Sequence, residues 1–353
     1  ILISFSAYAL LLLAAVVVKR YAAISLPASL LFVAMFPLLY LAELINMMTF
    51  HLPDAMFLRL CVALLIAGVV LIVVRKRGGD IARIQCAFSV LEVLLIVWVV
   101  HSVLFFLVYS GIPGRAPYVD EQHFYYTAAL NMIVDGFSAA HHASYDSGIM
   151  YSLGVPFMAA FPAKLFGSQN PHIPFFMPLI VIFSLACFLR ELRSKPVAYF
   201  FLVTAIAATF NNDGWLGFLC YRLIYGEGIS MVFFLMLTAA LVSVAETEKL
   251  ELKALSIFSL CAGAIYYTKS PVMYTGMAFS VVLFMLAVRK AGLRSFTGRI
   301  AAACLGCCLL PVLAWSGYVY TASVPVNAVI GVAGGIHFNQ DMWERMATYM
   351  RDT

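Results

Sequence analysis

The sequence has little charge: Asp, Glu, Lys and Arg make up 11% of its 353 residues, whereas a soluble domain has roughly 25%. Apolar residues make up 64% of the chain. This composition excludes an ordinary water-soluble domain. The sequence also lacks strands that alternate apolar and polar residues, which excludes a transmembrane barrel. The remaining class is an all-α polytopic membrane protein.

Long apolar runs recur along the whole chain. A helix needs about 20 apolar residues to cross the hydrocarbon core of a bilayer. We predict about ten transmembrane helices by this measure. They cover residues 1–18, 22–46, 57–74, 86–110, 172–190, 196–212, 224–245, 254–270, 272–288 and 300–321.

The net charge of +5 predicts no nucleic-acid partner, because the basic residues lie in alternate loops instead of on one face. Threading the helices in order places these loops on one side of the membrane, and the positive-inside rule makes that side cytoplasmic. Fifteen of the 22 basic residues are in these loops: Lys19, Arg20, Arg75, Lys76, Arg77, Arg83, Arg190, Arg193, Lys195, Lys249, Lys253, Arg289, Lys290, Arg294 and Arg299.

External disulfides and a zinc site are also not indicated. Nearly all of the eight cysteines lie inside apolar runs, which favours packing. Cys304, Cys307 and Cys308 have half of a zinc spacing, but no His or Asp is near them.

One external loop, residues 111–171, is too long for an idle connection. The adjacent acids Asp120 and Glu121 lie in its first part. We expect a short juxtamembrane helix over residues 121–135, where apolar positions recur at helical spacing. A second such helix is expected over residues 151–167, which are interrupted by proline and too short to span comfortably.

Four elements follow one another in a recognisable order. Asp120 and Glu121 open the external loop, and residues 151–167 read Tyr-x-Leu-x-x-Pro and end in Leu-Phe-Gly. Glu227 opens a later span on the outer side, and residues 268–270 read Thr-Lys-Ser at an outer edge. This order resembles that of the GT-C glycosyltransferases, such as aminoarabinose transferases and protein mannosyltransferases.

The resemblance implies a division of the chain into three parts. Residues 86–321 match the GT-C-like transmembrane module with its external loop, and residues 1–85 are extra N-terminal transmembrane helices. Residues 322–353 are an external polar segment. We expect that this segment can continue beyond the given sequence. The sequence departs from the family at Glu227, where the family often has Asp, and in the three additional spans before the module.

The resemblance also implies transfer of a sugar from a polyprenyl-phosphate donor to an acceptor hydroxyl on the outer membrane face. Such a transfer needs a base for the hydroxyl proton, and cations that stabilise the leaving phosphate. We assign Asp120 as general base. Glu121 is expected to orient the acceptor, to hold a neighbouring group or to help a metal. Glu227 completes the sugar or acceptor site. A single displacement with this arrangement inverts the anomeric carbon.

The remaining candidates bind substrate. Lys269 and Arg222 are candidates for the phosphate. His123 is a candidate base or ligand, and Tyr125 and Tyr151 are candidates for stacking on the sugar. Each has a plainer alternative: a lysine that reaches the headgroups, a structural ion pair of Arg222 with Glu227, a surface histidine, and an aromatic belt at the interface.

A cofactor is not specified by the sequence. Asp120, Glu121 and His123 could hold Mg²⁺ or Mn²⁺ through water, but no dedicated cage is visible. Two acids within spans, Glu43 and Glu92, are expected to face other helices, with a proton relay as the alternative.

Two other classes of function remain open. One is a transporter or flippase of lipid-linked saccharides, and the other is a membrane assembly subunit without catalysis. A polysaccharide polymerase or ligase is a close enzymatic neighbour of the favoured function. The expected partners are the bilayer, the lipid-linked donor, and a lipid, glycan or protein acceptor. The expected location is the bacterial inner membrane, with the active site on the periplasmic face.

Overall fold

All regular elements in the described part of the chain are helices. The computed structural model describes residues 2–22, 24, 26–76, 89–110, 126–138, 140, 153–210, 226–247, 251–268, 272–291 and 297–321. Its elements are α1 (Leu2–Ala22), α2 (Ala28–Thr49), α3 (Asp54–Lys76), α4 (Val90–Ser110), α5 (Thr127–Val134), α7 (Gly154–Phe166), η2 (Ile173–Phe176), α8 (Pro178–Glu191), α9 (Lys195–Phe210), α11 (Gly226–Glu246), α12 (Leu252–Ala264), η3 (Ile265–Tyr267), α13 (Met273–Ala291), α14 (Thr297–Ala301), η5 (Ala302–Gly306) and α15 (Cys307–Thr321).

The all-α membrane class is confirmed by these helices. A described helix overlaps each of the ten predicted ranges. Six stretches are long and apolar enough to cross a membrane: Leu2–Arg20, Ala28–Thr49, Asp54–Arg75, Gly228–Glu246, Met273–Lys290 and Gly298–Thr321. The count of ten stays a prediction, because α4, α8, α9 and α12 are not among the six.

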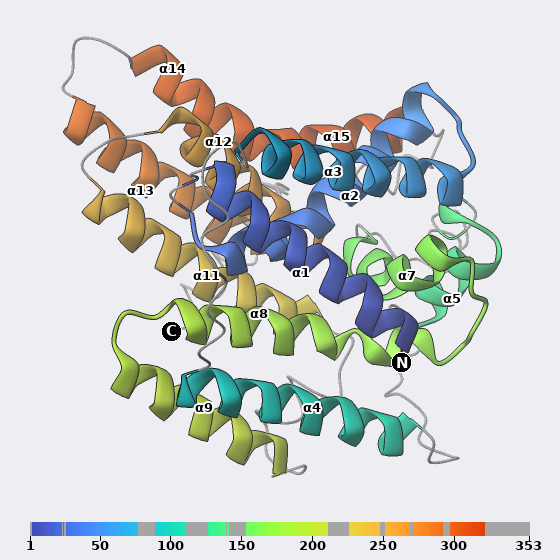
Figure 1. Cartoon of the computed structure of the whole chain (residues 1–353). Helices are drawn as coiled ribbons and strands as arrows, with labels where there is room; N and C mark the ends of the chain where they lie inside the picture. The colour runs from blue at the N-terminus through green and yellow to red at the C-terminus, as the bar shows by residue number, and fades with distance from the viewer. Residues whose placement is uncertain are drawn as a thin grey trace, which may run out of the picture.

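The helices share one hydrophobic core, with α2 near its centre (Figure 1). Helix α2 packs against α1, α3, α7, α8, α11, α12 and α15. Helices α4, α8 and α9 pack on one another along one side of the bundle, and α5 and α7 lie together at one end of it. The first three helices therefore contribute to the same core as those that follow residue 86.

Two glycines let helices approach closely around α12. A Cβ atom added to Gly263 would lie 2.0 Å from the carbonyl oxygen of Cys308 in α15. One added to Gly276 in α13 would lie 2.0 Å from the carbonyl oxygen of Ala262. Small residues at such contacts allow backbones to pack closely where water provides no driving force between helices.

The connection between α2 and α3 is a tight turn fixed by one amide. The side chain of Asn46 donates to the carbonyl of Leu52 at 2.9 Å and accepts from its backbone N–H at 3.1 Å. His51 between them has a left-handed φ of 52°. This turn lets α2 continue to Thr49 and α3 begin at Asp54, so both helices extend beyond the predicted limits of 46 and 57.

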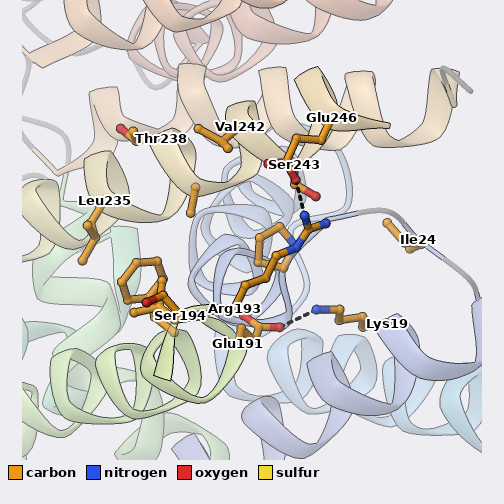
Figure 2. Close-up of a pocket in the computed structure, with 14 residues that line it drawn as sticks. Lys19, Ile24, Glu191, Arg193, Ser194, Leu235, Thr238, Val242, Ser243 and Glu246 are labelled. Atoms are coloured by element: carbon orange, nitrogen blue, oxygen red, sulfur yellow. Dashed lines mark hydrogen bonds and ion pairs between the residues drawn. The ribbon is translucent and has the colours of Figure 1, made fainter. Parts of the chain in front are cut away.

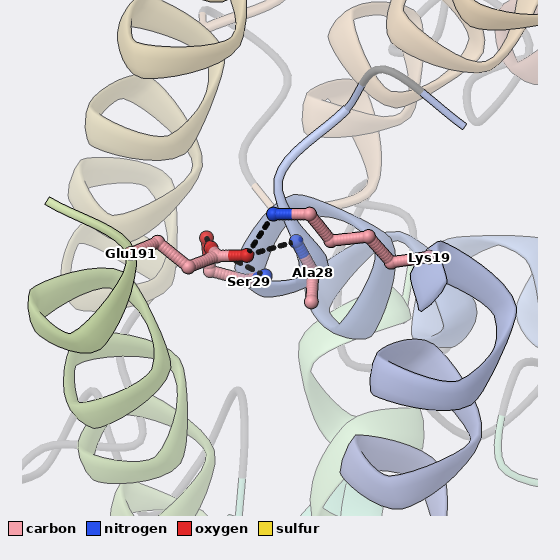
Figure 3. Close-up of polar contacts among 4 residues, drawn as sticks. All are labelled: Lys19, Ala28, Ser29 and Glu191. Atoms are coloured by element: carbon pink, nitrogen blue, oxygen red, sulfur yellow. Dashed lines mark hydrogen bonds and ion pairs between the residues drawn. The ribbon is translucent and has the colours of Figure 1, made fainter. Parts of the chain in front are cut away.

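Helix α2 is capped at its N-terminus by another helix. Its N-cap position is Pro27, which makes no side-chain capping bond. Glu191 at the end of α8 accepts from the backbone N–H groups of Ala28 at 2.6 Å and Ser29 at 3.2 Å (Figure 3). Glu191 also bonds Lys19 Nζ at 2.6 Å. A carboxylate at a helix N-terminus satisfies orphan donors and complements the helix dipole.

Polar contacts form one group at each end of the bundle, and both groups agree with the predicted threading. Ion pairs join Lys19 to Glu191, Arg190 to Glu92, and Arg193 to Glu246, all at ends predicted on the basic side. The contacts of α5 and α7 lie at the ends predicted on the other side. Which group faces the cytoplasm stays a prediction.

Candidate functional site

The predicted site residues lie almost entirely outside the described part of the chain. Glu227 is the second residue of α11, and its side chain is outside the described residues. The other predicted residues are wholly outside them: Asp120, Glu121, His123, Tyr125, Tyr151, Arg222 and Lys269. Their roles stay predictions.

The start of α11 is joined to the segment that ends at Thr268. The hydroxyl oxygens of Ser230 and Thr268 lie 2.7 Å apart and share a hydrogen bond. Thr268 also bonds the carbonyl of Ile265 at 2.7 Å, and both hydroxyl side chains are buried. Glu227 precedes Ser230 by one helical turn, and Lys269 directly follows Thr268. Two predicted site residues therefore adjoin one buried contact.

The start of α7 is fastened to the same end of the bundle through aromatic side chains. The backbone N–H of Leu153 donates to the hydroxyl of Tyr40 at 2.9 Å. The ring of Tyr40 packs edge-on against Tyr267 with 4.7 Å between centroids and against Phe157 at 5.4 Å, and it is tilted against Phe137 at 5.4 Å. Edge-to-face rings contribute beyond the area they bury. Leu153, two residues after Tyr151, is thereby held beside η3.

Close backbone contact locks α7 and η3 together. A Cβ atom at Gly154 would lie 2.5 Å from the carbonyl oxygen of Tyr267, so only glycine fits here. The hydroxyl of Tyr267 in turn donates to the carbonyl of Pro311 in α15 at 2.8 Å. The chain between η3 and α13, in which Lys269 lies, therefore leaves from a rigidly packed position.

An acid at the start of α3 anchors α5 and α7. Oδ2 of Asp54 accepts a hydrogen bond from the backbone N–H of Phe137 and lies 3.8 Å from Nζ of Lys164 in α7. Gly136 between α5 and Phe137 has a φ of 101°, which favours glycine, and a Cβ atom added to it would lie 3.0 Å from Oδ2 of Asp54. One carboxylate thus ties both short helices to α3.

A second acid lies close to this contact inside the bundle. Glu43 in α2 is only 2% exposed, which confirms that it faces other helices. Asn46 approaches its carboxylate at 3.5 Å. Glu43, Asp54 and Lys164 line a small cavity together with apolar residues of α3, α5 and α7. Burial lowers the pKa of Lys164, and the charges of Asp54, Glu43 and Asp135 oppose that shift.

Tyr126, the residue before α5, is also attached to a distant part of the chain. The hydroxyl of Tyr126 donates to the carbonyl of Pro171 at 2.9 Å, which joins the start of α5 to the end of the segment 111–171. Burial raises the pKa of this tyrosine. The loop is therefore structured on both sides of its undescribed parts.

The two short helices predicted in the loop are present, but α7 differs from expectation. The prediction of a helix lying on the membrane is wrong for α7, because its residues 154–163 are all buried by the surrounding helices. Apart from Lys164 the residues of α7 are small or apolar on every side, and a helix that is apolar all round is buried. Its single charged residue, Lys164, lies beside Asp54 and Glu43.

Sequence reasoning missed the group formed by Glu43, Asp54 and Lys164. A lone lysine in the apolar run of α7 was a usable signal, because a charge in such a run carries a functional presumption. Its pairing with Asp54 could not be read, because the two residues are far apart in the sequence. Among the described residues no group of three His, Cys, Asp or Glu side chains could hold a metal.

Comparisons with models of protein families, with curated proteins and with solved structures gave no match.

Proposed function

We propose that the chain is a membrane glycosyltransferase. It moves a sugar from a polyprenyl-phosphate donor to an acceptor hydroxyl at the end of the bundle that carries α5 and α7. The observation that carries the proposal is the hydrogen bond between Ser230 and Thr268. This bond fastens the segment of Glu227 to the segment of Lys269, two residues that the sequence order assigns to one site.

The aromatic contact adds a third segment to this end of the bundle. Leu153 follows Tyr151 by two residues and bonds Tyr40, whose ring lies on Tyr267 next to Thr268. Three segments with predicted site residues thus leave from adjoining packed positions. A site that must align donor, acceptor and base benefits from such rigid supports, because small displacements cost much of the rate.

The chemistry follows from the residue types. Asp120 takes the proton of the acceptor hydroxyl as the new glycosidic bond forms at the anomeric carbon. The bond from that carbon to the donor phosphate oxygen breaks, and Lys269 and Arg222 stabilise the charge on the leaving phosphate. Glu121 and Glu227 orient the sugar and the acceptor. Attack opposite the leaving group inverts the anomeric configuration.

The test uses purified protein in liposomes with a panel of radiolabelled polyprenyl-phosphate sugars and an acceptor extract of membrane lipids and glycans. We expect transfer of label from one donor to the acceptor fraction. We expect Lys269→Met to reduce it strongly, and Lys253→Met, on the opposite side, to leave it unchanged. Label that crosses the bilayer while still attached to its polyprenyl lipid would instead establish a flippase.

A further inference from the structure

A cleft opens at the other end of the bundle, between the ends of α1, α8 and α11 (Figure 2). Its volume is about 600 Å³, within the range of about 300–1,000 Å³ typical of pockets for small molecules. Four charged residues lie in its wall: Lys19, Glu191, Arg193 and Glu246. The rest of its wall is mostly apolar.

The two ion pairs in this wall differ in how firmly they are held. Glu191 bonds Lys19 and also caps α2 through Ala28 and Ser29, so this pair belongs to the fold. Arg193 Nη1 lies 2.8 Å from Glu246 Oε2, with side chains that are 85% and 48% exposed. An exposed pair of this kind contributes little to stability, so it opens at small cost. Only Arg193 and Glu246 are free to exchange partners.

The depth of the cleft matches one leaflet of a bilayer. On α11 the lining runs from Leu235 to Glu246. That length is about 16 Å at 1.5 Å per residue, and half of a hydrocarbon core is about 15 Å. The charged residues are at the helix end, and Leu235, Ala239 and Val242 line the part farther along α11 with Phe188. Thr238 also lines this part, and its hydroxyl is bonded to the carbonyl of Phe234 in its own helix. From the helix end inward the lining thus changes from charged to mostly apolar, as a phospholipid changes from its headgroup to its acyl chains.

We propose that this cleft binds a phospholipid with a zwitterionic phosphoethanolamine headgroup. Arg193 donates to its phosphate, and its ammonium donates to Glu246, so the exchangeable pair is replaced by two charge-assisted contacts. One acyl chain lies along α11 from Val242 to Leu235. An anionic headgroup without an ammonium would leave Glu246 facing negative charge. A choline headgroup has no N–H to donate.

This inference does not rest on the proposed catalysis. Ser230 lies at the opposite end of α11 from Glu246, about 24 Å away along the helix axis. Loss of lipid binding and loss of glycosyl transfer are therefore separable.

The test is native mass spectrometry of the purified protein in detergent, with dioleoyl phosphatidylethanolamine, phosphatidylcholine or phosphatidylglycerol added. We expect one phosphatidylethanolamine to bind about tenfold more tightly than either other lipid, because only it satisfies both charges. Glu246→Gln should remove this preference and favour phosphatidylglycerol. Glu251→Gln is the matched control, because Glu251 is exposed at the start of α12 and is not in the lining.

Two further measurements distinguish a site for the whole lipid from a site for its headgroup alone. Ala239→Phe fills the apolar part of the cleft and should weaken binding of all three lipids. Glycerophosphoethanolamine, which has the headgroup without acyl chains, should not compete with the lipid at equal concentration. Equal binding of the three lipids by the wild type would overturn the proposal, as would an unchanged preference in Glu246→Gln or effective competition by the chainless headgroup.

Discussion

Ser230 and Thr268 share a buried hydrogen bond of 2.7 Å between their hydroxyl groups, and this bond joins α11 to the segment after α12. The bond lies one helical turn beyond Glu227 and directly before Lys269. It is the described contact nearest to two of the predicted site residues. It therefore offers a way to disturb the proposed site without touching a proposed catalytic or binding residue.

Replacing this threonine by its isostere tests that role. Thr268→Val removes the hydroxyl and keeps the shape, so we expect a loss of about 1 kcal/mol in the free energy of unfolding and a lower rate of glycosyl transfer. Thr268→Ser should restore both. Denaturation in detergent and the transfer assay measure the two effects. Thr204→Val is the control, because Thr204 bonds only the preceding turn of α9 among the contacts described. Equal effects of both valine variants would contradict the assignment.

The close packing of α12 on α15 depends on Gly263. Gly263→Ala puts a methyl group 2.0 Å from the carbonyl oxygen of Cys308, so the helices must separate. We expect destabilisation of about 1–3 kcal/mol, the usual cost of overpacking. Gly68→Ala in α3 is the matched control, because nothing lies within 4 Å of its added Cβ atom. Thermal unfolding of both variants in one detergent gives the comparison, and equal midpoints would show that α12 and α15 are not in close contact.

Lys164 predicts a pH dependence of stability. Burial lowers its pKa below the ordinary value of 10.5 in the folded protein. Between the lowered pKa and 10.5 the unfolded chain binds more protons than the folded one, so the free energy of unfolding rises with pH in this window. The rise should be absent in Lys164→Met. Unfolding midpoints of both proteins over the alkaline range measure it, and a difference that stays flat or falls with pH would contradict the assignment.

Asp54 should be essential for attaching the external segment. Asp54→Asn removes the charge beside Lys164, and Asp54→Ala also removes the acceptor for the backbone N–H of Phe137. We expect the alanine variant to be the less stable, by about 1–3 kcal/mol, with faster hydrogen exchange in α5. Hydrogen exchange followed by mass spectrometry localises the effect. Exchange that is faster across the whole chain, and not in α5 and α7 first, would argue against a local anchor.

The sidedness of the chain can be tested by labelling. Gln169→Cys in the external loop should react with a membrane-impermeant maleimide in intact cells, and Lys253→Cys should react only after the membrane is opened. The parent chain, with its eight native cysteines, provides the background. The opposite pattern would invert the topology and place the predicted site in the cytoplasm.

The helices were predictable because long apolar runs and the alternation of basic loops can be read directly from the sequence. The turn at Asn46 was not predicted. Its side-chain amide bonds the backbone of Leu52, and this contact exists only in the folded chain. The burial of α7 depends on α1, α2 and α3 closing around it. The group of Glu43, Asp54 and Lys164 brings α7 against the turn between α2 and α3, and Lys164 is more than 100 residues away from the two acids, so neither spacing nor composition indicated it.

The candidate site was predicted in a different way. Asp120 and Glu121 were chosen by their position and by a family resemblance, and they lie outside the described residues. What the structure adds is the packing of the neighbouring segments, at Tyr126, Leu153, Ser230 and Thr268. These contacts are hydrogen bonds between segments far apart in the sequence, so the sequence alone did not indicate them.

The most direct measurement is glycosyl transfer by wild type and Asp120→Asn at matched folding, with Asp135→Asn as the control. Asp135 is exposed at the end of α5 and has no proposed role in the chemistry. We predict that transfer from the polyprenyl-phosphate donor is retained in the control and falls by about 10²–10⁴-fold in Asp120→Asn, the usual contribution of a general base. Equal transfer by all three proteins would contradict the assignment of Asp120 as the base.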